Sequence, residues 1–176
     1  MSDFRFTRPD NFPPIVKNLI IINVLVYVAQ LTLANRFPVT EWLLLWPVMP
    51  DKLINYLVES GALESSQHFK PYQLATHLFA HSPSSIFHIF FNMFTLWMFG
   101  KILENVWGGQ RFLFFYLACG LGAAALHLGI QYVRCEELLQ AFEANNMRAV
   151  QENIGSVSPA LGASGAVMGV MVAFAY

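Results

Sequence analysis

The sequence predicts an all-α protein, a polytopic bundle of transmembrane helices. Charged residues make up 12% of the 176 residues and hydrophobic residues 56%, whereas an ordinary soluble domain carries about 25% charged residues. So little charge cannot cover a surface that faces water. Disorder is excluded too, because disordered chains are poor in aromatic residues and this chain has 16 Phe, 4 Trp and 6 Tyr. A net charge of -1 without a basic run argues against a nucleic-acid partner, so the lipid bilayer is the expected environment.

The apolar stretches of the chain predict its spans, since about 20 apolar residues are needed to cross the hydrocarbon core as a helix. Four stretches meet or approach that length, at residues 15–34, 85–103, 112–133 and 159–176. The first ends in Asn35-Arg36-Phe37-Pro38 without a small-residue cleavage site, so it is expected to be a retained span rather than a signal peptide. A short connection through Gly108-Gly109 makes the second and third spans antiparallel neighbours.

The fourth stretch is barely long enough to cross, and it stops at Tyr176 without a flanking polar residue. We therefore expect residues 1–14 to form an N-terminal arm and residues 15–176 to form a membrane domain that is incomplete at its C-terminus. Short basic segments stay in the cytoplasm, and here they flank the first span and the turn between the second and third spans, at Arg5, Arg8, Lys17, Lys101 and Arg111. The N-terminal arm should therefore be cytoplasmic. Compact loops and the lack of a cleavable presequence favour a bacterial inner membrane.

The two long loops, residues 35–84 and 134–158, contain apolar residues at helical spacing. In the first loop, Leu53, Ile54, Leu57 and Val58 predict a helix that lies in the membrane interface. In the second loop, residues 136–152 are typical of a short amphipathic helix, which we interpret as a solvated helix without a function.

Polar groups inside a membrane are costly, so each one is a functional hypothesis. His88 and Asn92 are four residues apart and therefore project from one face of the second span. Ser164 opens the fourth span within Gly162-Ala163-Ser164-Gly165, on the same side of the membrane as the start of the second span. We expect the three side chains to converge. Small residues around the serine, with Gly165 and Gly169 one turn apart, let a neighbouring helix approach closely.

Such a set favours acyl transfer by a serine nucleophile, which needs a hydroxyl, a base and donors for the developing oxyanion. His88, Asn92 and the backbone amide of Ser164 can donate, the last near a helix N-terminus. A base is not obvious, because no histidine follows Ser164. The residues taken singly have simpler interpretations: Gly-x-Ser-Gly is an ordinary helix-packing pattern, and His88 with Asn92 could join two helices by hydrogen bonds.

His77 and His81 have the spacing of zinc ligands, but Leu78 stands where a His-Glu zinc protease needs its glutamate base. We therefore predict no metal, and an unrelated helical membrane protein or a histidine-based metalloenzyme is a remaining alternative.

Together these motifs form a pattern that extends over most of the chain. Its parts are Tyr72 to His81, His88 to Met93, then Gly100, Glu104 and Gly108, and finally Gly162-Ala163-Ser164-Gly165. The pattern resembles the rhomboid family of intramembrane serine proteases over roughly residues 15–176.

The resemblance implies a bundle of at least six spans that cleaves transmembrane segments of membrane-protein substrates near the outer face, without a cofactor. Ser164 would be the nucleophile, and His88, Asn92 and the Ser164 amide would bind the oxyanion. The remaining matched residues would form the serine motif or support the structure: Gly162, Ala163 and Gly165 in the motif, and His77, His81 and Glu104 as structural residues.

The chain departs from the family at two places. Tyr72 and Gln73 stand where the family has a Trp-Arg pair, so an ion network built on that arginine is in doubt. The catalytic histidine lies on the sixth span of the family, and this chain ends before a fifth. We therefore expect the natural enzyme to be longer and these 176 residues alone to cleave nothing. The alternative is a catalytically inactive pseudoprotease that binds membrane-protein clients.

Overall fold

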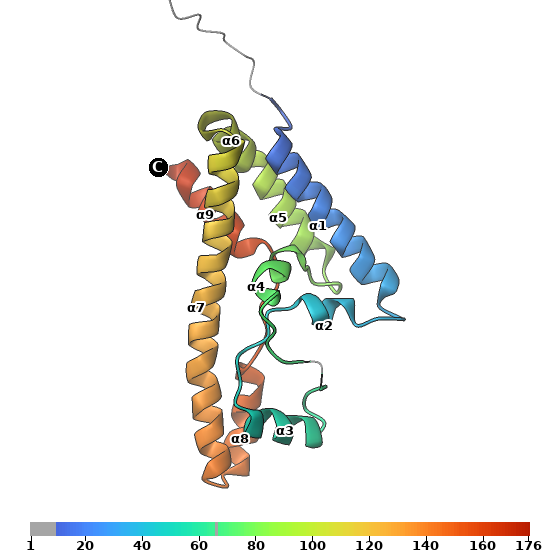
Figure 1. Cartoon of the computed structure of the whole chain (residues 1–176), viewed down its shortest axis with the longest axis vertical. Coiled ribbons are helices and arrows are strands. Elements are labelled where there is room, and N and C mark those ends of the chain that lie inside the picture. Colours follow the sequence, from blue (N-terminus) through green and yellow to red (C-terminus); the bar gives the residue numbers. More distant parts are fainter. Residues whose placement is uncertain (1–9, 66) are drawn as a thin grey trace, which may run out of the picture.

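The computed structural model describes residues 10–65 and 67–176, which form an elongated, all-helical bundle (Figure 1). In chain order the helices are α1 (Pro14–Leu33), α2 (Val39–Leu43), α3 (Asp51–Glu59), α4 (Gln73–Thr76), α5 (Ile86–Thr95), α6 (Lys101–Trp107), α7 (Gly109–Glu143), α8 (Met147–Asn153) and α9 (Ser164–Ala175). A π-helical turn, Leu96–Gly100, joins α5 to α6, and no strand occurs within the described ranges. The predicted all-α class is confirmed. Arg5 and Arg8 of the predicted arm lie outside the described residues.

Three helices of the described chain are long and apolar enough to cross a membrane, namely Pro14–Leu33, Ile86–Trp107 and Gly109–Glu143. The predicted count of four is not confirmed, because α9 has only 12 residues. At 1.5 Å per residue α9 is about 18 Å long, well short of the ~30 Å hydrocarbon core. The expected helix start near residue 159 was wrong for a tertiary reason. The backbone of Ala160 is instead paired with that of Leu45 by hydrogen bonds of 2.9 and 3.0 Å.

The two long loops pack on each other. This differs from the interfacial helix expected in the first loop and from the solvated helix expected in the second. Instead of ending near residue 133, α7 continues to Glu143, and α8 follows after a turn at Asn145 with a φ of 55°. Residues from α3, α7 and α8, together with Met49 just before α3, form a separate buried cluster; the helical members are Leu53, Leu57, Cys135, Leu138 and Val150. The apolar face of α3 is therefore covered by protein rather than by the membrane interface, and the second loop is a packed structure rather than a solvated helix (Figure 1).

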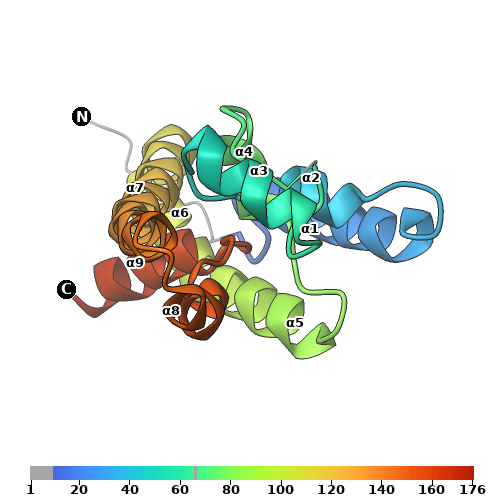
Figure 2. The same ribbon diagram turned by 90° about the horizontal axis from the view of Figure 1, so that it is seen from below.

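The main core lies among the spans, with α9 between α7 and α5 (Figure 2). Its fully buried side chains include Val16, Leu96, Phe112, Tyr116, Ala166 and Val170. Glu104 of α6 fixes the start of α1, because its carboxylate accepts hydrogen bonds from the backbone amides of Ile15 and Val16 at 2.9 and 2.8 Å. These amides belong to the first turn of α1, which leaves its N–H groups without partners inside the helix. The predicted structural position of Glu104 is thus a helix cap.

The loop between α1 and α5 is held by two buried glutamine side chains. Gln30 of α1 accepts from the His81 amide at 2.9 Å and donates to the His81 carbonyl at 3.0 Å. Gln73 accepts from the amides of Lys70 and Trp46 at 3.0 and 3.3 Å. Position 73, where the family has an arginine, therefore organises this loop through neutral hydrogen bonds rather than through an ion network.

Glycines allow α9 to lie directly against α7. A Cβ on Gly165 would overlap the Cβ of Ala123, and a Cβ on Gly169 would overlap the side chain of Cys119. Gly120 of α7 is equally close to its neighbour, since a Cβ there would lie 2.6 Å from Leu78 Cδ2. Small residues at these contacts confirm the close helix approach that the sequence predicted.

We expect Gly165→Ala to destabilise the protein by about 1–3 kcal/mol, the usual cost of overpacking, because the methyl group of Ala123 cannot move aside. Unfolding in detergent micelles measures the effect. Gly122→Ala on α7 is the matched control, since a Cβ there meets nothing within 4 Å. Adding Ala123→Gly to Gly165→Ala should restore most of the lost stability. Equal stability of the Gly165 and Gly122 variants would contradict the packing.

His81 is a buried ionisable group in the loop between α4 and α5, outside the three spans. Burial lowers its pKa from the ordinary 6.5 to about 4, the Phe79 carbonyl partly offsets this, and the charge of nearby His88 lowers the pKa further. Its Nε2 has no hydrogen-bond partner among the residues described.

The lowered pKa predicts an acid-sensitive fold. The unfolded chain takes up this proton below about pH 6.5 and the folded protein only near pH 4, so stability is complete above 6.5 and falls between 6.5 and 4. The slope for one proton is at most about 1.4 kcal/mol per pH unit. His81→Asn should flatten this part of the unfolding profile, whereas His68→Asn, in the segment between α3 and α4, should not. An unchanged profile in His81→Asn would assign the acid sensitivity to another group.

Candidate active site

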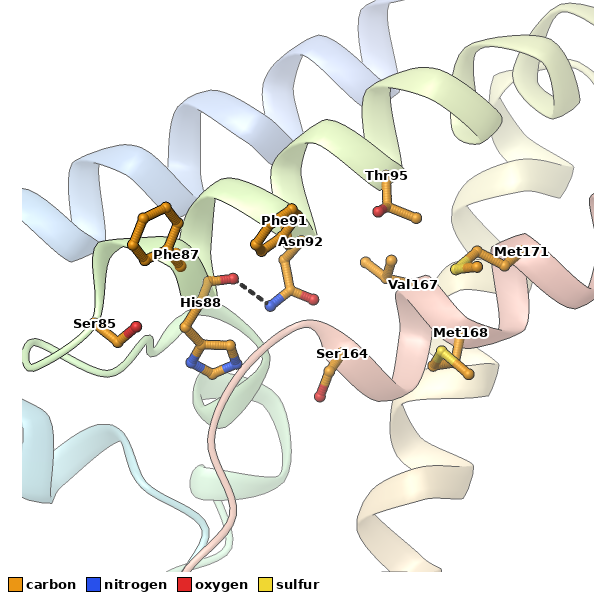
Figure 3. Close-up of a pocket in the computed structure, with 10 residues that line it drawn as sticks. All are labelled: Ser85, Phe87, His88, Phe91, Asn92, Thr95, Ser164, Val167, Met168 and Met171. Carbon is orange, nitrogen blue, oxygen red and sulfur yellow. Dashed lines mark hydrogen bonds between the residues drawn. The ribbon is translucent and has the colours of Figure 1, made fainter.

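Ser164, His88 and Asn92 line one pocket between α5 and α9 (Figure 3). Its volume is about 340 Å³. The other lining residues are Ser85, Phe87, Phe91, Thr95, Val167, Met168 and Met171. His88 and Asn92 project from the same face of α5 toward the first residue of α9. The structure therefore brings together the three side chains that the sequence singled out.

Asn92 is held in a fixed orientation by its own helix. Its Nδ2 donates to the carbonyl oxygen of His88 at 2.8 Å, one turn earlier in α5. A side-chain amide has two N–H donors, so this bond leaves one N–H for a ligand in the pocket. The side chain is only 7% exposed, which makes a donor to a bound oxygen more effective than it would be in water.

His88 has a defined tautomer when its ring is neutral. The backbone amide of Ser82 donates to Nδ1 at 3.4 Å, so Nδ1 is the unprotonated nitrogen and Nε2 carries the hydrogen. Nε2 lies beside the backbone of Gly162. A Cβ at Gly162 would lie 2.9 Å from both Nε2 and Cε1 of His88. Gly162 also has a φ of +104°, which L side chains rarely adopt, so this position favours glycine for two independent reasons.

Ser164 is the first residue of α9, and Ala163 is the N-cap. The first hydrogen bond of the helix runs from the Val167 amide to the Ala163 carbonyl at 2.9 Å, so the Ser164 amide points out of the helix end. Gly162, one position before the N-cap, is anchored separately. Its amide donates to the His77 carbonyl at 2.8 Å. The serine is thus held both by its helix and by the segment that leads into it.

A second, smaller cavity of about 120 Å³ lies on the other side of Ser164 and is also bordered by His77 and Gly120. The Nδ1 of His77 lies 2.8 Å from the Gln73 carbonyl. A carbonyl only accepts, so Nδ1 carries the proton and Nε2 of the neutral ring is unprotonated. Within the described ranges, no three His, Cys, Asp or Glu side chains gather closely enough to hold a metal ion. His77 and His81 therefore lack a third ligand for the zinc alternative.

Sequence reasoning missed two groups that shape this site. Gln30 fixes the loop that leads into α5, and Ser82 sets the tautomer of His88. Gln30 had a usable signal, because it is a polar residue within the last turn of an apolar span. Ser82 acts through its backbone, and a backbone contact leaves no signature in residue type.

The comparisons with known proteins agree with this geometry. Residues 68–176 match the Rhomboid domain, a range that includes His88, Asn92 and Ser164. The presenilin-associated rhomboid-like protein of Bos taurus, a mitochondrial protein, is 30% identical over 140 residues. The aligned part is 80% of this chain and 30% of the bovine protein, so the chain spans less than a third of that relative's length.

The described chain has three helices that are long and apolar enough to cross a membrane, and the matched domain includes every residue that lines the pocket. This integral membrane protein belongs to the rhomboid family.

Proposed function

We propose that the chain carries the nucleophile and the oxyanion-binding groups of an intramembrane serine endopeptidase that cleaves transmembrane segments. The observation that carries the proposal is the shared pocket of Ser164, His88 and Asn92 between two apolar helices. Rhomboid proteins act on membrane proteins within the bilayer and are generally serine proteases, which supports the same reaction class.

In the proposed reaction, the Ser164 hydroxyl attacks the carbonyl carbon of the scissile peptide bond. The carbonyl oxygen becomes an oxyanion as the new C–O bond forms. Three donors are available to it: the Nε2–H of His88, the free N–H of Asn92 and the backbone amide of Ser164. Such fixed donors stabilise the transition state because they need no reorganisation when the charge appears.

The proton of the Ser164 hydroxyl must pass to a base within about 2.6–3.2 Å. Nε2 of His88 is a donor in the neutral ring and is unsuited to this task. The family supplies its base from a histidine on a later span, and no histidine follows Ser164 in these 176 residues. A polypeptide limited to residues 1–176 therefore lacks the family's base and should be inactive.

The pocket wall favours an apolar substrate. Phe87, Phe91 and Met168 are 65%, 59% and 58% exposed respectively, although they line the pocket around the polar groups. Side chains of this kind in a membrane-spanning helix face lipid or an apolar partner. A transmembrane segment of a membrane protein satisfies this requirement, and its backbone would supply the carbonyl.

A second candidate is a pseudoprotease that binds membrane-protein clients without cleaving them. It is favoured by the bovine relative, whose name describes it only as rhomboid-like. The same pocket would serve as the binding site. The expectation of a bacterial inner membrane gains no support from this relative, which is mitochondrial by name.

The test of the proposed function is cleavage of a reconstituted transmembrane substrate by the protein isolated from the membranes of its own cells. Ser164→Ala should abolish cleavage, a loss of at least about 10³-fold. Ser84→Ala, at an exposed serine in the loop before α5, is the control and should cleave normally. Cleavage by Ser164→Ala would refute the proposal. Stable capture of the substrate without cleavage, equal in both variants, would favour the pseudoprotease.

Gly162→Ala should lower kcat with little effect on KM, because the added methyl group displaces the His88 ring from the oxyanion position. We expect a decrease of about ten- to a hundred-fold, less than the 10²–10³ that follows removal of an oxyanion donor. Gly155→Ala is the matched control, since a Cβ there meets nothing within 4 Å. An unchanged kcat in Gly162→Ala would exclude His88 from transition-state binding.

A further inference from the structure

The membrane-facing surface carries an apolar groove between α1 and α5, on the opposite side of α5 from the candidate site. Its volume is about 550 Å³, within the usual range for ligand pockets. Ile20, Val24 and Tyr27 form the wall from α1, and Ile86, Phe90 and Phe94 are among the residues from α5. The two helices run side by side to the end of the bundle where α6 begins (Figure 1). No residue of this groove lines the pocket of Ser164.

Stacked aromatic rings form one continuous wall of the groove. The Phe90 and Phe94 rings have centroids 6.0 Å apart and planes 8° from parallel. Trp97 follows at 6.2 Å from Phe94, and Phe12 lies 6.0 Å from Trp97. Trp97 is fixed further, because its indole N–H donates to the Asn11 carbonyl at 3.2 Å. The Phe94 and Trp97 ring planes are tilted by 46°, so the wall is a preformed apolar surface, not a flat one, and it needs little ordering when a chain lies along it.

Both walls of the groove end in a lysine at the same end of the bundle. On α1, Lys17 precedes Ile20 by three residues and so lies on the same side of the helix. On the other wall, the Nζ of Lys101 lies 4.0 Å from the centre of the Trp97 ring. The ion pairs of the described chain involve other cations, Lys52 and Arg148.

The acidic groups near these lysines are occupied by backbone amides. The Asp10 carboxylate accepts from the Phe12 amide at 2.9 Å, and Glu104 is buried as the cap of α1. Asp10 and Glu104 keep their negative charges, but among the described residues neither forms an ion pair with Lys17 or Lys101. Both ammonium groups are therefore available to a phosphate at the mouth of the groove.

The length of the groove favours one lipid acyl chain as its occupant. Ten residues separate Lys17 from Tyr27, which is about 15 Å at the helical rise. That distance is half of the ~30 Å hydrocarbon core, the depth of a single leaflet. One lipid acyl chain matches this depth, whereas a transmembrane helix would extend well beyond the groove. The two lysines without ion-pair partners can bind a phosphate at the interface, where each basic residue attracts anionic lipid by about 1 kcal/mol.

We propose that this groove binds one phospholipid with an anionic headgroup, whose acyl chain lies along the Phe90–Phe94–Trp97 wall and whose phosphate lies between Lys17 and Lys101. Bound there, the lipid stabilises α5 against α1 from the side opposite His88 and Asn92. The proposal does not depend on the activity of Ser164, so it can stand or fail independently of the protease assignment.

Fluorescence of Trp97 tests the proposal. Trp42, Trp46 and Trp107 are replaced by Phe, and the full chain is placed in phosphatidylcholine vesicles. Equal fractions of either dibrominated phosphatidylglycerol or dibrominated phosphatidylcholine are then added, because a brominated chain quenches an indole that it touches. We expect a relative binding constant about three- to ten-fold higher for the anionic lipid. Equal quenching by both lipids, or quenching by neither, would overturn the proposal.

Charge variants separate a specific site from general attraction to the membrane. Lys17→Gln should remove most of the preference for the anionic lipid, whereas Lys52→Gln should keep it. Lys52 is the matched control, since it is a lysine on α3 that pairs with Glu143 at 3.8 Å, away from the groove. An equal loss of preference in both variants would contradict the site.

A second measurement leaves all tryptophans in place. Native mass spectrometry of the unaltered chain after mild detergent extraction should retain one anionic phospholipid per chain, and Lys17→Gln should lose it. Retention that does not change in this variant would assign the lipid to another place.

Discussion

The close contact between α9 and α7 is the constraint on which the site depends. Gly165 and Gly169 present no side chain toward α7, so the two backbones approach until Ala123 and Cys119 fill the contact. In a membrane, helices gain little from the hydrophobic effect, and contact between small residues provides much of the attraction. Because α9 rests directly on α7, its first residue, Ser164, faces α5 across an open pocket instead of being buried in a three-helix core.

The segment leading into Ser164 is fixed from a second direction by the first long loop. The Gly162 amide bonds to His77, and the Ala160 backbone pairs with Leu45. The loop itself is tied to α1 through Gln30, which holds both backbone groups of His81. Both Ser164 and the loop that leads to His88 are therefore positioned by hydrogen bonds to a shared support. Such a fixed geometry is what the proposed binding of an oxyanion would require.

The two sides of α5 line different cavities. One side presents His88 and Asn92 to the candidate active site, and the other forms the aromatic wall of the groove toward α1. If the groove holds an anionic lipid, as proposed, the composition of the membrane affects the stability of the helix that carries His88 and Asn92, although the groove and the pocket share no residue.

The sequence alone determined the helical class, the first two spans and the three polar residues that share one pocket, Ser164, His88 and Asn92. Periodicity and spacing are local properties: four residues between His88 and Asn92 place them on one face in any helix, and Gly-x-Ser-Gly indicates a closely packed helix start. The tertiary structure decided where the helices end. Pairing of Ala160 with Leu45 delays α9 to Ser164, and packing of Leu138 on α3 extends α7 to Glu143. These ends depend on partners that are distant in the chain, 115 residues in the case of Leu45 and Ala160, so no local pattern could encode them.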